Sequence, residues 1–177
     1  VAAVRQKSTI PLVFLTYINP VFHYGYEAFF AKCQELGVDG IIIPDLPYEE
    51  KSEIAALAAQ HGVDIISLIA PTSEERIGKI ARSATGFIYL VSSMGVTGVR
   101  SEIQTDLSAI VQTIRRNSSV PIAIGFGIHT PQQAHDMAQI ADGAIVGSAI
   151  VKIIAEHGAQ SAPYLDDYVR QMKAAIR

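Results

Sequence analysis

The chain has 177 residues, of which 49% are hydrophobic and 18% charged, a composition typical of one globular domain rather than of a disordered chain. The formal net charge of −3 offers no basic face for nucleic acid or an anionic membrane, so we expect a small-molecule ligand. The single cysteine, Cys33, excludes an internal disulfide and suggests a packing role in a cytoplasmic protein. No apolar run is long enough for a membrane span.

Six short apolar runs predict buried strands. They lie at 11–17, 39–45, 64–71, 87–91, 121–127 and 143–147. Because these runs are almost continuously hydrophobic instead of alternating with polar residues, they are typical of parallel strands that meet water on neither face.

Helical patterns lie between the strands. Apolar residues at helical spacing predict three buried helix faces, formed by Tyr26, Phe29, Phe30, Cys33 and Leu36 before a stop at Gly37, by Ile54, Leu57 and Ala58, and by Leu107, Ile110, Val111 and Ile114. Thr72 with Glu75, and Thr130 with Pro131 and Gln133, predict two capped helix starts.

Strict alternation of strand and helix predicts an α/β fold, either a (β/α)₈ TIM barrel or an open doubly wound sheet. The first strand of a dinucleotide-binding sheet needs a glycine-rich turn, and the segment 12–20 contains no glycine. The barrel is therefore favoured.

Two glycine-rich strand ends predict a phosphate site. Gly125 and Gly127 follow one strand, and Gly147 and Ser148 join the next strand to a helix, where backbone N–H groups and the helix dipole favour an anion. The alternative is that these glycines only permit tight turns and close packing.

The place of this site suggests which strands the chain contains. Barrels of this kind bind phosphate after strands seven and eight, so the six strands are expected to be strands 3 to 8, the last six β/α units. Residues 1–177 are then a single TIM-barrel domain whose N-terminal part, about 60 residues or more, is expected to be missing.

Four strings of the sequence resemble one family. They are TYINPVFHYG (16–25), PDLPYEE (44–50), YLVSSMGVTGVR (89–100), and GFGI with GSAIVKII (125–128 and 147–154). In this order they resemble the tryptophan synthase alpha family from about Pro11 to the C-terminus.

The resemblance implies a lyase of tryptophan biosynthesis. The family cleaves indole-3-glycerol phosphate to indole and glyceraldehyde 3-phosphate, and passes indole to a beta subunit in an alpha2beta2 heterotetramer. Pyridoxal phosphate belongs to that beta subunit, so no cofactor is expected here. A phosphosugar isomerase or epimerase, or a non-catalytic fragment that binds the beta subunit, are the alternatives.

The resemblance also implies the residues of the site. Phosphate contacts fall on Gly98, Gly125, Gly127, Gly147 and Ser148. Apolar contacts with indole fall on Leu15, Ile42, Leu68, Tyr89 and Phe126, although ordinary barrel core explains each of them at least equally well when taken alone. Tyr17 is a further substrate-binding residue.

The segment 92–100 resembles the mobile loop of the family and is expected to act as a lid, with Thr97 and Tyr89 supporting the chemistry. Ser93 replaces an arginine of many family members, which puts a loop-closing contact of that side chain in doubt. The catalytic Glu and Asp of the family lie upstream of residue 1, so the chain is expected to be inactive alone. Asp45 is expected to have a structural or interface role.

The resemblance places Asn19, Pro20, Phe22, His23 and Pro47 against the beta subunit, although Phe22 alone fits simple packing equally well. The five histidines, at 23, 61, 129, 135 and 157, lack metal-ligand spacing, so no metal is expected.

Overall fold

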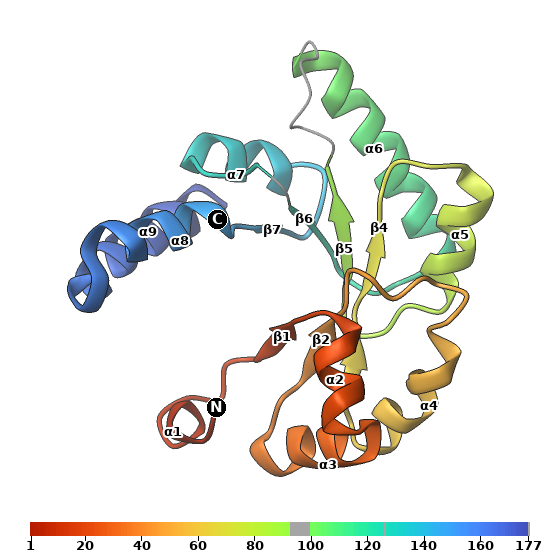
Figure 1. Cartoon of the computed structure of the whole chain (residues 1–177). Coiled ribbons are helices and arrows are strands. Elements are labelled where there is room, and N and C mark those ends of the chain that lie inside the picture. Colours follow the sequence, from red (N-terminus) through yellow and green to blue (C-terminus); the bar gives the residue numbers. More distant parts are fainter. Residues whose placement is uncertain (93–99, 126, 177) are drawn as a thin grey trace. The chain divides into compact units, whose positions relative to one another are not determined.

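The structure, a computed structural model, describes residues 1–92, 100–125 and 127–176 (Figure 1). The elements in chain order are α1 (Ala2–Arg5), β1 (Val13–Leu15), α2 (Ile18–Tyr24), α3 (Tyr26–Leu36), β2 (Gly40–Ile42), α4 (Ser52–Gln60), β3 (Asp64–Ile65), β4 (Ser67–Ile69), α5 (Glu74–Arg82), β5 (Ile88–Val91), α6 (Arg100–Asn117), β6 (Ile122–Gly125), α7 (Pro131–Ala138), β7 (Gly143–Ile145), α8 (Ser148–His157), η1 (Gly158–Gln160) and α9 (Ala162–Ala175). The predicted alternation of strands and helices is confirmed in outline but is not strict, because β4 follows β3 without a helix and two helices, α2 and α3, lie between β1 and β2.

The strands form two sheets, with the orders β1-β2-β3 and β4-β5-β6-β7. β1 pairs in parallel with β2, β2 with β3, β5 with β6, and β6 with β7. The strand predicted at 64–71 is divided between β3 and β4, and so between the two sheets. Ile66 lies at the division, where its N–H donates to the carbonyl of Ile41 over 2.9 Å.

Contacts divide the chain into two compact units, 1–68 with 83–87 and 69–82 with 88–177. In the first unit, apolar residues of α3, α4 and the strands form a core that contains Phe30, Cys33, Ile41, Ile54 and Ala58. Cys33 thus has the predicted packing role, and burial raises the pKa of its thiol. One domain over 1–177 remains a prediction.

In the second unit, buried and half-exposed residues alternate along β5 and along most of β6. Ile88 and Leu90 of β5 and Ile122 and Ile124 of β6 are buried, whereas Tyr89 on the opposite face of β5 is half-exposed. This alternation arises because successive side chains of a strand point to opposite faces. The prediction that the strands meet water on neither face is therefore wrong for β5.

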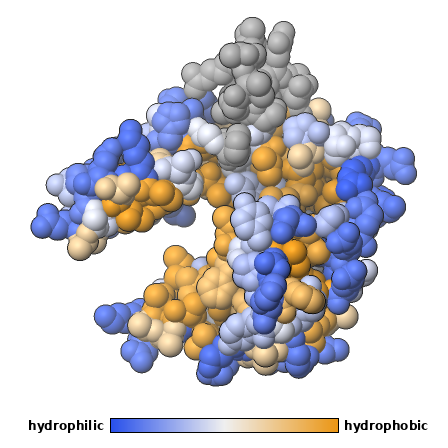
Figure 2. Space-filling view, viewed as in Figure 1, coloured by the Kyte–Doolittle hydropathy of each residue, from blue (hydrophilic) through white to orange (hydrophobic). Residues whose placement is uncertain are grey.

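The same prediction is wrong for β1, whose three residues are all exposed. β1 has one paired neighbour in its sheet, whereas β2 lies between two strands and is buried along its whole length. Apolar surface is visible over this part of the first unit in Figure 2. Burial of a strand therefore follows its place in the sheet as well as its hydrophobicity.

The predicted helix limits are largely confirmed. α3 ends at Gly37, which adopts the left-handed conformation with φ 71°. Thr130 and Gln133 form the predicted capping box at the start of α7. The cap predicted at Thr72 is wrong by one residue, because α5 begins at Glu74 and the hydroxyl of Ser73 accepts the N–H of Arg76 at 3.3 Å.

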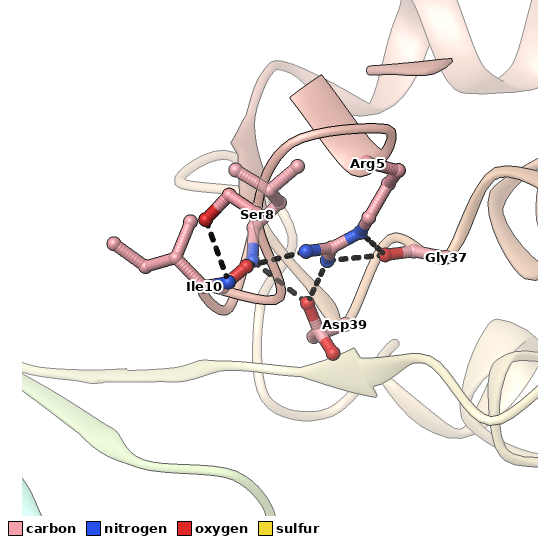
Figure 3. Close-up of polar contacts among 6 residues, drawn as sticks. Arg5, Ser8, Ile10, Gly37 and Asp39 are labelled. Atoms are coloured by element: carbon pink, nitrogen blue, oxygen red, sulfur yellow. Dashed lines mark hydrogen bonds and ion pairs between the residues drawn. The ribbon is translucent and has the colours of Figure 1, made fainter. Parts of the chain in front are cut away.

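An arginine and an aspartate tie α1 to the first sheet (Figure 3). The guanidinium of Arg5 donates to the carbonyls of Gly37 and Ile10 and lies 2.6 Å from Oδ2 of Asp39. The same carboxylate oxygen accepts the N–H of Leu12 at 2.7 Å, and the N–H of Asp39 returns a bond to the carbonyl of Leu12 at 2.9 Å. These bonds fix the chain just before β1 and β2.

Candidate functional site

Gly125, the last residue of β6, lies against the ring of Tyr89 from β5. A Cβ atom on Gly125 would lie 2.5 Å from Cε2 of Tyr89, closer than real side-chain contacts allow. The carbonyl of Gly125 accepts both the N–H and the hydroxyl of Ser92, at 2.9 and 3.1 Å. At Gly125 the glycine therefore permits the observed packing of the Tyr89 ring, which agrees with the structural alternative considered for the strand-end glycines.

Gly127 follows β6 and differs from Gly125. Its φ of 78° lies in the region that favours glycine, and no described atom lies within 4 Å of the position that a Cβ would take. Space beside the backbone combined with a positive φ is what close approach of a ligand to the backbone requires.

α8 begins directly after Gly147, and both Gly147 and Ser148 are exposed. Among the described residues, no side chain caps this helix start with a hydrogen bond. The first N–H groups of a helix have no partner within the helix and carry its partial positive charge. The start of α8 is therefore suited to an anion.

Gly127 and Ser148 line one pocket of about 560 Å³ in the second unit. Its lining comes from the segment after β6, from α8 and from α9, and consists of Gly127, Ile128, His129, Ser148, Ala149, Lys152, Ile153, Glu156 and Tyr168. The structure thus brings together two of the predicted phosphate residues, one from each strand end. It also places cationic and hydroxyl groups beside them.

Sequence reasoning missed four polar residues of this pocket, His129, Lys152, Glu156 and Tyr168. Lys152 had a detectable signal, since it follows Ser148 by four residues and so lies one helical turn further along α8. Its Nζ lies 3.9 Å from Oε1 of Glu156, at the limit of an ion pair. Tyr168 had no such signal, because it comes from α9.

Three predicted residues, Thr97, Gly98 and Phe126, lie outside the described residues, as does most of the predicted lid with Ser93. Tyr89 is described, and burial raises the pKa of its hydroxyl. The remaining indole residues belong to the first unit.

In the first unit, Leu15 and Ile42 are register partners on β1 and β2, which places their side chains on the same face of the sheet. Leu15 is 67% exposed and Ile42 8%. Tyr17 precedes α2 and is 64% exposed, and Leu68 on β4 is half-buried. The structure therefore brings Leu15 and Ile42 together as an apolar pair.

Four of the predicted interface residues lie on or beside one turn of α2. Asn19, Pro20, Phe22 and His23 are all exposed, and Phe22 reaches 63% although its ring meets those of His23 and Tyr26. This exposure argues against simple packing of Phe22 beneath a helix. Pro47, the fifth, is exposed in the segment between β2 and α4.

Asp45 caps α2 from a distant part of the sequence. Its Oδ1 accepts the N–H of Ile18, the first residue of α2, at 2.9 Å. A carboxylate at a helix start satisfies a free N–H group and interacts well with the helix dipole. Asp45 therefore has a structural role, and it joins the segment before Pro47 to the helix that carries Asn19, Pro20, Phe22 and His23.

Residues 1–92, 100–125 and 127–176 contain neither a cluster of metal ligands nor a membrane-spanning helix. Among these residues, no three or more His, Cys, Asp or Glu side chains are grouped so that they could hold a metal ion. In the same part of the chain, no helix has both the length and the apolarity needed to cross a membrane.

Comparison with known proteins gives consistent results. All of residues 1–177 match the family described as tryptophan synthase alpha chain. The chain is 53% identical over 176 residues to the tryptophan synthase alpha chain of Lacticaseibacillus casei, covering 99% of this chain and 66% of that protein. It is 55% identical over 177 residues to that of Lactiplantibacillus plantarum, covering 99% and 67%.

Solved structures agree with this result. The alpha subunit of tryptophan synthase from Campylobacter jejuni superposes with a TM-score of 0.85 at 36% identity, covering 96% of this chain and 66% of that one. A structure of the tryptophan synthase a2b2 complex from Pyrococcus furiosus gives 0.85 at 31% identity, covering 98% and 70%.

The chain spans about two thirds of the length of the curated relatives named above. The family match and the structural likenesses confirm the predicted (β/α)₈ barrel class. On the match over its whole length and on the identity to these relatives, the chain belongs to the tryptophan synthase alpha chain family.

Proposed function

We propose that this chain binds indole-3-glycerol phosphate and serves the lyase reaction that cleaves it to indole and glyceraldehyde 3-phosphate in tryptophan biosynthesis. One observation carries the proposal beyond family membership: Gly127 and Ser148 line the same pocket, at the uncapped start of α8. That arrangement is what a phosphate group requires.

The phosphate half of the site relies on backbone donors. Gly147 and Ser148 present the first N–H groups of α8, the Ser148 hydroxyl adds a donor, and Gly127 leaves room for an oxygen beside its backbone. Gly98 is proposed as a further contact by resemblance. Gly125 acts indirectly, because it allows the ring of Tyr89 to lie over the end of β6.

The residues that the resemblance assigns to indole include an apolar pair in the first unit. Leu15 and Ile42 share one face of the first sheet and provide the kind of surface that a flat heteroaromatic ring buries. Tyr17, Leu68, Tyr89 and Phe126 complete the proposed set by resemblance.

The chemistry requires positioned carboxylates, since a ring carbon gains a proton while a glycerol hydroxyl loses one. By resemblance a Glu and an Asp do this in the family, and Thr97 and Tyr89 are proposed to support them. Asp45 is engaged as a helix cap at 2.9 Å and is a poor substitute. No cofactor is assigned to this chain.

The proposed partner is the beta subunit, which holds pyridoxal phosphate and receives indole. An alpha2beta2 heterotetramer is supported by the a2b2 complex of the relative from Pyrococcus furiosus. The proposed contact is the exposed turn of α2 with Asn19, Pro20, Phe22 and His23, together with Pro47. The 63% exposure of Phe22 suits an aromatic anchor.

Calorimetric titration of the polypeptide with indole-3-glycerol phosphate and with glycerol 3-phosphate tests the proposal. We expect both to bind, and the indole compound to bind more tightly because it buries an additional apolar ring. Ser148→Asp should weaken both by more than about tenfold, since the new carboxylate repels the phosphate.

The matched control is Ser161→Asp, which adds the same charge at the start of α9 and should leave both affinities unchanged. Equal affinity for the two ligands would instead show that the proposed apolar residues make no contact with the indole ring. Absence of phosphate binding in the unmodified polypeptide would refute the proposal.

A further inference from the structure

The segment after β6 that contains Gly127 is held from one side by α7. The side-chain oxygen of Gln133 accepts the N–H groups of His129 and Thr130 at 2.9 and 3.1 Å, and the hydroxyl of Thr130 accepts the N–H of Gln133 at 3.2 Å. This capping box fixes the end of the segment that enters α7. It makes no bond to Gly127 itself.

A second set of bonds reaches Gly127 from α9. The hydroxyl of Tyr168 donates to the carbonyl of His129 over 3.0 Å, although 39 residues separate them in the sequence. The imidazole Nδ1 of His129 then lies 2.9 Å from the carbonyl of Gly127, which is a hydrogen bond in the tautomer that carries the proton on Nδ1. Tyr168, His129 and Gly127 thus form a chain of hydrogen bonds.

Tyr168 also lies where two pockets meet. It lines the pocket that contains Gly127 and Ser148, and it lines a second, mainly apolar pocket of about 300 Å³ with residues of β7, α7, α8 and α9, including Ala144 and Met172. Burial raises the pKa of the Tyr168 hydroxyl, so it keeps its proton at neutral pH and remains a donor.

Gly127 needs such restraint. No described atom lies within 4 Å of its Cβ position, so packing does not hold the residue on that side. Glycine also has the largest backbone freedom of any residue, and ordering it on binding costs free energy. A loop that is already hydrogen-bonded in the bound geometry avoids part of this cost.

We propose that Tyr168 is a positioning residue for the phosphate site, which it serves by holding Gly127 in place through His129. The inference rests on the proposed function, because it assumes that Gly127 and the start of α8 bind phosphate together. It assigns to the C-terminal helix α9 a role in substrate affinity, without contact between Tyr168 and the reacting atoms.

Tyr168→Phe removes the hydroxyl and keeps the ring in both pockets. We expect the dissociation constants for inorganic phosphate and for glycerol 3-phosphate to rise about fivefold, the effect of losing one hydrogen bond of ordinary strength. Both are measured by NMR titration well below the melting temperature. Tyr164→Phe is the matched control, since Tyr164 lies on the same helix and its ring stacks on His157 with centroids 3.6 Å apart.

His129→Ala provides a second, independent variant, because it removes the imidazole and keeps the carbonyl that Tyr168 bonds. If the three residues act as one chain, the double variant should bind phosphate no more weakly than about the worse single variant. This comparison of affinities among folded proteins separates positioning from a general loss of stability, which the melting temperatures report.

Three outcomes overturn the inference in distinguishable ways. If the unmodified chain binds phosphate and Tyr168→Phe binds it equally well, Tyr168 has no positioning role and the proposed function stands. If the unmodified chain does not bind phosphate, the proposed function fails and the inference fails with it. A fully additive double variant would show that Tyr168 and His129 act separately.

Discussion

The two units of the chain begin a pair of parallel strands in the same way. In the first unit, Leu12 N–H donates to Asp39 Oδ2 at 2.7 Å, and Asp39 N–H donates to the Leu12 carbonyl at 2.9 Å. In the second unit, Ile122 and Asp142 exchange the same two bonds, both at 2.9 Å. We call each pair an Asp clamp.

The sequence around the two Asp clamps is also alike. Each aspartate is followed by a glycine that opens a strand, Gly40 in β2 and Gly143 in β7, and each partner follows a proline, Pro11 or Pro121. In each Asp clamp the carboxylate accepts the N–H of the residue just before the first paired residue of the neighbouring strand. This residue is Leu12 before Val13 of β1, and Ile122 before Ala123 of β6. A single Asp-Gly pair thus sets where the pairing of two strands begins.

The Asp clamps differ in their surroundings. The arginine beside Asp39 lies 2.6 Å from the carboxylate and its side chain is 21% exposed, whereas Arg115 lies 3.3 Å from Asp142 and is 53% exposed. The first Asp clamp is therefore part of a network, and the second is closer to an isolated pair. This difference predicts unequal effects of equivalent substitutions.

The largest effect is expected from removing each aspartate. Asp39→Ala should lower the free energy of unfolding by about 2.5 kcal/mol, because two charge-assisted bonds are lost, and Asp142→Ala by about 1.5 kcal/mol. Urea unfolding gives these values. Amide hydrogen exchange shows where stability is lost. In Asp39→Ala the Leu12 N–H should exchange faster, whereas the Ile122 N–H should stay protected. Equal losses would mean that the surrounding network contributes nothing.

The next effect concerns the glycine beside each aspartate. A Cβ on Gly40 would lie 3.0 Å from the carbonyl oxygen of Asp64, whereas a Cβ on Gly143 would lie 3.8 Å from Cβ of Ala123. Gly40→Ala should therefore cost about 2 kcal/mol through overpacking against backbone. Gly143→Ala should change stability by less than about 0.5 kcal/mol, or raise it slightly, since alanine restricts the unfolded chain. A large loss at Gly143 would contradict this account.

Much of this fold could be predicted because its signals are local. The helix face around Phe30 and Cys33, and the capping box of Thr130 with Gln133, depend on residues within one helix. The Thr72 cap failed because Ser73, the adjacent hydroxyl, competes for the same role at the start of α5. Local patterns identify a helix start within a residue and leave the choice between neighbouring caps to tertiary structure.

The non-local features could not be predicted in the same way. α2 was not expected because its N-terminal acceptor, Asp45, lies 27 residues away in the sequence. The contact of Tyr168 with His129 spans 39 residues and left no pattern in either segment. At the candidate site, the sequence pattern predicted glycines at the strand ends. It could not show that Gly125 packs against Tyr89 whereas Gly127 has free space beside its backbone.

The smallest effects on the free energy of unfolding are expected from replacing the arginine beside each aspartate. Arg5→Ala should cost about 1.5 kcal/mol, because the guanidinium also bonds the carbonyls of Gly37 and Ile10, whereas Arg115→Ala should cost less than about 0.5 kcal/mol, as exposed ion pairs usually do. Arg5→Lys keeps the charge but lacks the planar guanidinium with its several N–H donors. It should therefore recover less than half of the stability lost in Arg5→Ala. If lysine restores full stability, charge alone holds the first Asp clamp. If lysine restores none of it, the hydrogen bonds from the guanidinium to the carbonyls of Gly37 and Ile10 matter more than the ion pair with Asp39. The first Asp clamp is then stabilised mainly by these carbonyls, one of which belongs to the C-terminal cap of α3.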